Sequence, residues 1–155
     1  MMMLDVLLDA QAICLDHRAQ SKKRVLEQAA HLLCGSDDQA QVEQIFARLL
    51  ARERLGSTGL AAGVALPHAR LPGLTQSRAA FIRLHQAVDF DSQDGQPVDL
   101  VFVLLVPEEA TDEHLHLLAA LARLFRDAAV CHSLRTTNDA IQTQQVLTGS
   151  IEDAT

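Results

Sequence analysis

Residues 99–106, Asp-Leu-Val-Phe-Val-Leu-Leu-Val, decide the fold, because seven of these eight residues are apolar and four are β-branched or aromatic. Pro97 and Pro107 bound the run, and proline cannot donate a hydrogen bond to a sheet. An apolar run that is continuous, without alternating polar positions, indicates a strand buried on both faces. The sequence therefore predicts a sheet that is covered on each side.

Two more strands are expected before this run. Val64-Ala65-Leu66 is a short apolar segment ended by Pro67, and residues 79–84 form a second apolar segment. Strands that alternate with helices along the chain predict an α/β layered fold. We expect one domain over residues 1–148, followed by a short C-terminal tail over residues 149–155.

Helices are predicted where apolar residues recur three and four positions apart. Ser21 can cap the first helix and Gly35 can end it. The second helix opens near Ser36 and ends near Gly56, and Thr111 caps a strongly periodic third helix. The expected helices lie near residues 21–35, 36–56, 111–125, 128–134 and 138–147.

Composition excludes several classes of function. The chain has 155 residues, a formal net charge of −7, 3% aromatic residues and no Trp or Tyr. This composition argues against nucleic-acid binding, which depends on clustered Lys and Arg and on aromatic stacking. No apolar run reaches the roughly 18 residues of a membrane span, and the N-terminus lacks the basic region of a signal peptide. We expect a cytoplasmic protein that is not inserted into a membrane.

Two of the seven histidines stand in contexts that suggest chemistry. His68 follows a glycine-rich turn and the Val64–Leu66 strand, at the edge of a sheet where ligand sites concentrate. His114 occupies the first turn of the helix capped by Thr111, where unpaired N–H groups favour an anion. His116 points to another face of that helix, so we expect no metal site at this pair.

Other familiar motifs are absent. The Gly56-Ser-Thr-Gly59 segment lacks the Lys-Ser or Lys-Thr ending of a phosphate loop, and no GxGxxG opens a helix. Ser57 does not stand in a GxSxG context, which argues against a serine hydrolase. The remaining candidates for a chemical role are a histidine nucleophile, the small residues around it, and a nearby arginine.

The pattern Glu53, six residues, Leu60-Ala61-x-x-Val64-Ala65-Leu66-Pro67-His68-Ala69 resembles the phosphorylation-site signature of one protein family. It is similar to the fructose/mannitol-type (type 2) IIA components of the bacterial phosphotransferase system. The similarity extends along nearly the whole chain to the nitrogen-regulatory branch of that family. The supporting segments are QSKKRVLE, ARERLGSTG, VDFDSQDGQPVDLVFVLLVP and HLHLLAALARLFRD.

The resemblance implies a role for five residues. His68 would be the phosphoryl acceptor through Nε2, Arg52 the active-site arginine, and His114 the second histidine of the site. Ser57 and Thr58 match small hydroxyl residues that would bind the phosphoryl oxygens. The resemblance also implies a mixed five-stranded sheet with helices on both faces.

The implied function is a regulatory phosphocarrier with a phosphohistidine intermediate and no cofactor. Its donor would be an HPr-like histidine phosphocarrier protein. The regulated partners would be proteins such as potassium transporters or sensor kinases, in nitrogen- or potassium-related control. The alternative is a sugar-transport component that relays phosphoryl groups to a fructose/mannitol-type IIB domain. The nitrogen-branch similarity, and the absence of a fused IIB or IIC domain in this sequence, favour regulation over metabolic turnover.

Three alanines depart from the family pattern. Ala61, Ala62 and Ala69 stand where related sequences often have Gly, Asn and Gly. If position 69 requires a positive φ, alanine there is strained and changes the approach of the backbone to the phosphoryl group.

Overall fold

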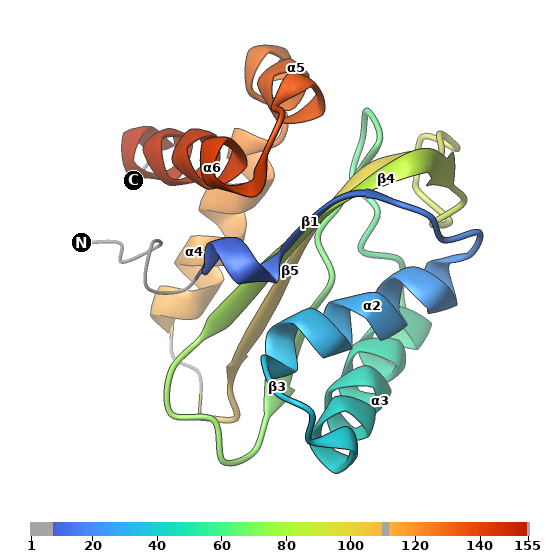
Figure 1. Ribbon diagram of the computed structural model, residues 1–155, viewed down its shortest axis with the longest axis vertical. Coiled ribbons are helices and arrows are strands. Elements are labelled where there is room, and N and C mark those ends of the chain that lie inside the picture. The colour runs from blue at the N-terminus through green and yellow to red at the C-terminus, as the bar shows by residue number, and fades with distance from the viewer. Residues whose placement is uncertain (1–7, 110–111, 155) are drawn as a thin grey trace.

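The computed structural model describes residues 8–109 and 112–154 (Figure 1). A short 3-10 turn, η1, precedes the first strand, and the chain then alternates between helices and strands. In chain order the elements are η1 (Ala10–Ala12), β1 (Ile13–His17), α2 (Lys22–Cys34), α3 (Gln39–Leu55), β2 (Val64–Ala65), β3 (His68–Leu71), β4 (Arg78–Val88), β5 (Val98–Pro107), α4 (Asp112–Leu124), α5 (Ala128–Thr136) and α6 (Ala140–Ala154).

The five strands form one mixed sheet, as the family resemblance implies, whereas the residues alone predicted three of these strands. The strand order is β1-β4-β5-β2, and β3 continues beyond β2 along the same edge of β5. Strands β4 and β5 are antiparallel, whereas β1 runs parallel to β4, and β2 and β3 run parallel to β5. The long β5 strand is therefore central, as expected from its unbroken apolar run.

Helices cover both faces of this sheet, and each face has its own apolar core (Figure 1). Helices α2 and α3 pack on one face through residues such as Leu26 and Ile45, which are fully buried. Helices α4, α5 and α6 pack on the other face, through Leu121, Leu134 and Leu147. Side chains of β5 alternate between the two cores, which explains why nearly every residue of this strand is apolar.

The ends of the first two helices follow local capping chemistry. The Ser21 hydroxyl accepts the Arg24 N–H at 3.2 Å, and Gly35 ends α2 with a φ of 68°, which confirms both predicted ends. Helix α3 begins later than expected, because Asp38 is its cap; its carboxylate accepts the Gln41 N–H at 3.2 Å.

Two features differ from the sequence-based expectation. Strands β1 and β3 were not predicted, because both are short, mix apolar with polar side chains and lie at the edges of the sheet. Residues 149–154, expected to form a tail, instead continue α6 as far as Ala154. Ile151 is buried in the core beneath α6, and this burial accounts for the longer helix. The proposed cap Thr111 lies outside the described residues.

Candidate functional site

His68 is the first residue of β3 and lies at the point where the chain resumes pairing with β5. The Pro67 carbonyl accepts the Leu104 N–H at 3.0 Å, and His68 pairs in register with Leu104. Ala69 follows inside the strand and is buried. A histidine at the start of a paired strand has a fixed backbone, so few torsions are left to orient its ring.

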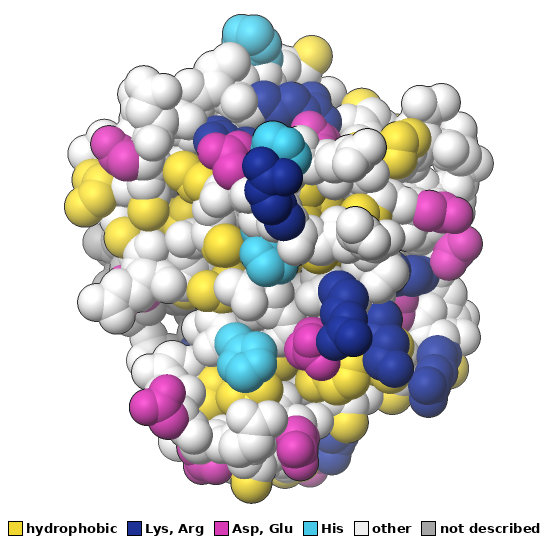
Figure 2. Space-filling model, turned by 45° about the vertical axis from the view of Figure 1, so that its right-hand side comes forward, with side chains coloured by type: hydrophobic (Ala, Val, Ile, Leu, Met, Phe, Trp, Pro, Cys, Tyr) yellow, Lys and Arg dark blue, Asp and Glu magenta, His cyan; other side chains and the backbone are white. Residues whose placement is uncertain are grey.

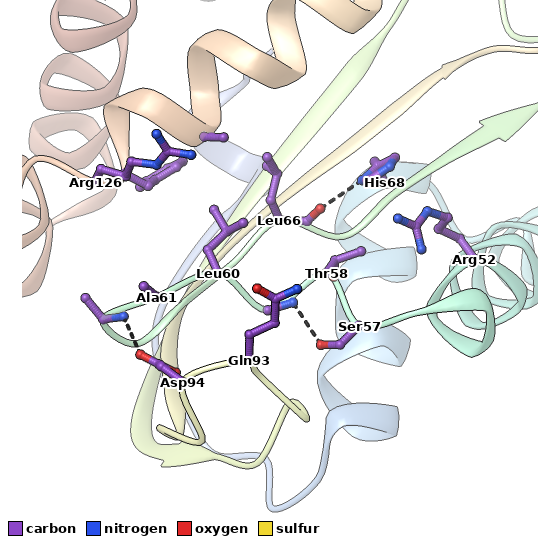
Figure 3. Close-up of a pocket in the computed structure, with 14 residues that line it drawn as sticks. Arg52, Ser57, Thr58, Leu60, Ala61, Leu66, His68, Gln93, Asp94 and Arg126 are labelled. Carbon is purple, nitrogen blue, oxygen red and sulfur yellow. Dashed lines mark hydrogen bonds between the residues drawn. The ribbon is translucent and has the colours of Figure 1, made fainter.

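The imidazole of His68 has a defined tautomer. Its Nδ1 lies 2.9 Å from the Leu66 carbonyl oxygen, which can only accept, so Nδ1 donates and Nε2 keeps a free lone pair (Figure 3). Burial lowers the pKa of His68 below its ordinary value of 6.5, and the charge of Arg52 acts in the same direction. The Leu66 hydrogen bond and the Glu53 carboxylate oppose this shift of the pKa. A neutral ring with an unprotonated Nε2 is a competent nucleophile.

Arg52 reaches toward His68 from the last turn of α3 (Figure 3). Its guanidinium donates to the Gly56 carbonyl at 2.9 Å. This bond holds one terminal nitrogen in place and leaves the other guanidinium N–H groups available. Arg52 and His68 both line a hollow of about 680 Å³ on one side of the imidazole. Its lining includes apolar side chains such as Leu66, and Arg126 lies at its far end, away from His68 (Figure 3).

His114 lies on a second hollow of about 490 Å³ that His68 and Arg52 also line. The two histidines and the arginine, from β3, α4 and α3, are therefore brought to one place, as the family resemblance implies. His114 is the third residue of α4, beside the N-terminal end of that helix, whereas His116 is exposed. The exposed Leu55 and Leu115 form part of the wall. Figure 2 shows one face of the molecule, on which His, Lys and Arg side chains lie among apolar and acidic ones.

The hydroxyls of Ser57 and Thr58 are engaged with the protein. The Ser57 hydroxyl donates to the Phe90 carbonyl and accepts the Gly59 N–H at 3.0 Å. Thr58 is buried, and its hydroxyl donates to Glu53 Oε2 at 2.7 Å. Both residues line the larger hollow, but a direct bond from either hydroxyl to a phosphoryl oxygen requires one of these bonds to break.

Glu53 was quoted in the signature but given no role by sequence reasoning. The structure buries this carboxylate beneath the loop of residues 56–63, where it accepts from Thr58 and from Lys22. Its neighbour Arg52 is half-buried and faces the hollow, since successive helical positions point about 100° apart. The helical periodicity could have predicted this burial, because position 53 lies on the same buried face of α3 as Leu49 and Val42.

The strained alanine is Ala62 and not Ala69. Ala69 lies in β3 in ordinary strand pairing and does not have a positive φ, so the condition under which alanine would be strained there is not met. Ala62 has a φ of 60°, in the left-handed region, and Gly63 follows with a φ of 83°. The Ala62 N–H donates to Asp94 at 3.1 Å and its carbonyl accepts from Arg135 at 2.9 Å, which holds this turn in place.

Within the described residues, His, Cys, Asp and Glu side chains do not gather in any group of three that could hold a metal ion. None of the helices in the described part of the chain combines the length and the apolar character that a membrane crossing requires.

Comparison with known proteins finds a family model and relatives that match most of this chain. The model of the phosphoenolpyruvate-dependent sugar phosphotransferase system EIIA 2 family matches residues 6–149. The nitrogen regulatory protein of Pseudomonas aeruginosa is 48% identical over 127 residues, which cover 82% of each chain. That of Bradyrhizobium diazoefficiens is 44% identical over 133 residues, which cover 84% of each. The crystal structure of the nitrogen regulatory protein IIA-Ntr from Neisseria meningitidis superposes with a TM-score of 0.88 and 44% identity, over 94% of this chain and 99% of that one.

Proposed function

Because this chain belongs to the EIIA type 2 family of the phosphotransferase system, we propose that it is a regulatory phosphocarrier that accepts a phosphoryl group on Nε2 of His68. Its relatives named nitrogen regulatory proteins support the regulatory output. The donor would be an HPr-like histidine phosphocarrier protein, and we place the exchange in the cytoplasm.

The observation that carries this proposal is the hydrogen bond from His68 Nδ1 to the Leu66 carbonyl. The Nε2 lone pair attacks phosphorus while the P–N bond to the donor histidine breaks, and the donor nitrogen takes back that electron pair. The His68 ring keeps its Nδ1 proton and becomes a phosphorylated imidazolium. The Leu66 carbonyl then accepts a hydrogen bond from a more acidic N–H, so the contact strengthens as charge develops.

Arg52 and His114 would bind the moving phosphoryl oxygens. A guanidinium provides several donors in a planar fork, and the N-terminal end of α4 favours negative charge near His114. Each charge-assisted hydrogen bond to a partly desolvated phosphoryl oxygen is worth about 1.5–3 kcal/mol. Ser57 and Thr58 would contribute by shaping the loop, or directly if their present hydroxyl bonds rearrange.

Phosphorylation would switch the surface around His68 between two states. The added phosphoryl group carries close to two negative charges, partly offset by the positive imidazolium, and it brings strong acceptor oxygens to a face that includes the exposed Leu55 and Leu115. A partner that docks on the apolar rim would be released by phosphorylation. Such partners would include potassium transporters or sensor kinases.

The test is incubation with a phosphorylated histidine phosphocarrier, followed by intact-mass measurement. We expect one phosphoryl group per chain, labile in acid and stable in alkali, and none on a folded His68→Gln variant. His132→Gln is the matched control, because His132 is an exposed histidine on α5. Equal labelling of His68→Gln and the wild type would refute the assignment.

A second experiment separates regulation from sugar relay. Phosphorylated and unphosphorylated protein are used side by side to capture binding partners, and a reconstituted extract is assayed for sugar phosphorylation. Partners that bind in one state alone support regulation. Sugar phosphorylation that depends on His68, without state-dependent partners, supports relay to a IIB domain.

A further inference from the structure

Glu53 is a buried carboxylate that the proposed transfer does not use directly. It lies in the last turn of α3, and its side chain is only 3% exposed. A carboxylate this deeply buried is costly unless a cation and several donors satisfy it. Its partners therefore indicate which part of the structure depends on it.

The strongest of these partners is Thr58. Glu53 Oε1 accepts the Thr58 N–H at 2.8 Å, and Oε2 accepts the Thr58 hydroxyl at 2.7 Å. Lys22 lies 3.4 Å from Oε1 and supplies the compensating positive charge, while it also pairs with Asp91 at 3.0 Å. Two bonds from one carboxylate to one residue fix both the position and the orientation of Thr58.

A chain of hydrogen bonds leads from Thr58 to the imidazole. The Thr58 carbonyl accepts the Leu66 N–H at 3.0 Å, and the Leu66 carbonyl accepts from His68 Nδ1 at 2.9 Å. Pro67 follows Leu66 and restricts the backbone of both residues. The place of the Leu66 carbonyl, and with it the bond to His68, therefore depends on where Thr58 is held.

We propose that Glu53 is a positioning residue for His68: by holding Thr58 it keeps the Leu66 carbonyl in place, so that the proton stays on Nδ1 and Nε2 stays unprotonated. This inference rests on the proposed function, in which Nε2 is the phosphoryl acceptor. The competing tautomer carries its proton on Nε2 and has no lone pair there. A shift of the Leu66 carbonyl increases the population of that unreactive tautomer.

A purely structural role for Glu53 makes a different prediction. If Glu53 only stabilised the loop, its loss would lower the free energy of unfolding but leave the tautomer and the rate per folded molecule unchanged. The ¹⁵N chemical shifts of the His68 ring report the tautomer directly, and they do so without any phosphoryl donor.

Three variants provide the test. Glu53→Gln keeps the size and one acceptor oxygen but loses the charge. Thr58→Val keeps the backbone N–H and the shape but loses the hydroxyl, and Thr58→Ser restores the hydroxyl. Glu43→Gln is the matched control, because Glu43 is exposed on the same helix. The measurements are the His68 ¹⁵N shifts and the initial rate of transfer from the phosphorylated carrier, per folded molecule.

We expect Glu53→Gln and Thr58→Val to mix the two His68 tautomers and to slow transfer by ~10- to 100-fold. Thr58→Ser should recover most of the rate lost in Thr58→Val, and Glu43→Gln should match the wild type. If Glu53→Gln does not fold, the Thr58 pair provides the same readout. An unchanged tautomer in the folded variants overturns the inference, even if their transfer is slower. A wild type that the carrier does not phosphorylate overturns the proposed function instead, while the tautomer still decides the inference.

Discussion

Replacing Gly59 by alanine should destabilise the loop that supports the site. A Cβ at this position would lie 2.3 Å from the Ser92 hydroxyl oxygen, and 3.1 Å from both Ser92 Cα and the Ser57 hydroxyl oxygen. The Ser92 hydroxyl is buried and has no hydrogen-bond partner among the described residues, so it can rotate away at little cost. The two contacts at 3.1 Å remain after that rotation.

The net cost follows from two opposing effects. Overpacking of a close contact typically costs about 1–3 kcal/mol. Alanine recovers about 0.4–1 kcal/mol by restricting the unfolded chain. The difference between these ranges runs from about 0 to 2.6 kcal/mol, and from its middle we expect Gly59→Ala to lower the free energy of unfolding by about 1–2 kcal/mol. Gly56→Ala is the matched control, because nothing lies within 4 Å of a Cβ there and its backbone is extended.

Urea unfolding followed by far-ultraviolet circular dichroism measures this difference, since the chain has no Trp or Tyr for intrinsic fluorescence. Ser92→Ala in the Gly59→Ala background should recover little of the loss, because the Ser92 hydroxyl can rotate away while the contacts with Ser92 Cα and the Ser57 hydroxyl remain. Equal stability of Gly59→Ala and Gly56→Ala would refute the packing argument. So would a double variant as stable as Gly56→Ala.

Further outcomes are expected at three positions. Because the pKa of His68 is lowered in the folded state, the unfolded state binds more protons below pH about 6.5, and the wild type loses stability as the pH falls. His68→Gln lacks this titration, so the difference in unfolding free energy in urea titrations should shift in favour of the variant as the pH falls, and a constant difference would contradict this. Arg52→Ala should slow phosphoryl transfer by about 10-fold or more. Arg54→Ala should not slow it, because Arg54 is an exposed arginine of the same turn. Equal transfer rates for the two variants would argue against a role for Arg52 in binding the phosphoryl group. Ala62→Gly should raise the melting temperature, because it removes the strain of an alanine in the left-handed region and so stabilises the fold by up to about 1 kcal/mol. A lower melting temperature would contradict this.

The secondary structure was predictable wherever local chemistry decides it. Ser21 and Gly35 fixed the ends of α2, and the apolar run of β5 indicated a covered sheet before any strand order was known. Strand β1 carries no comparable signal, because it is short and lies at the sheet edge. Its pairing with β4 is a long-range property that the local sequence does not encode.

The candidate site was predictable in its residues but not in its connections. The resemblance identified His68, Arg52 and His114, and the structure places all three around one hollow of about 490 Å³. The hydrogen bonds between Thr58 and Glu53 depend on how a loop packs against α3, and the sequence spacing does not reveal this packing. The strain at Ala62 was likewise invisible, because the sequence does not show which alanine adopts a positive φ.

The most direct test of the account is nuclear magnetic resonance of the ¹⁵N-labelled protein after phosphorylation by the carrier. We predict a phosphorus–nitrogen coupling to Nε2 of His68 and a retained proton on Nδ1, hydrogen-bonded to the Leu66 carbonyl. Coupling of phosphorus to Nδ1, or to a ring nitrogen of His114, would contradict the account.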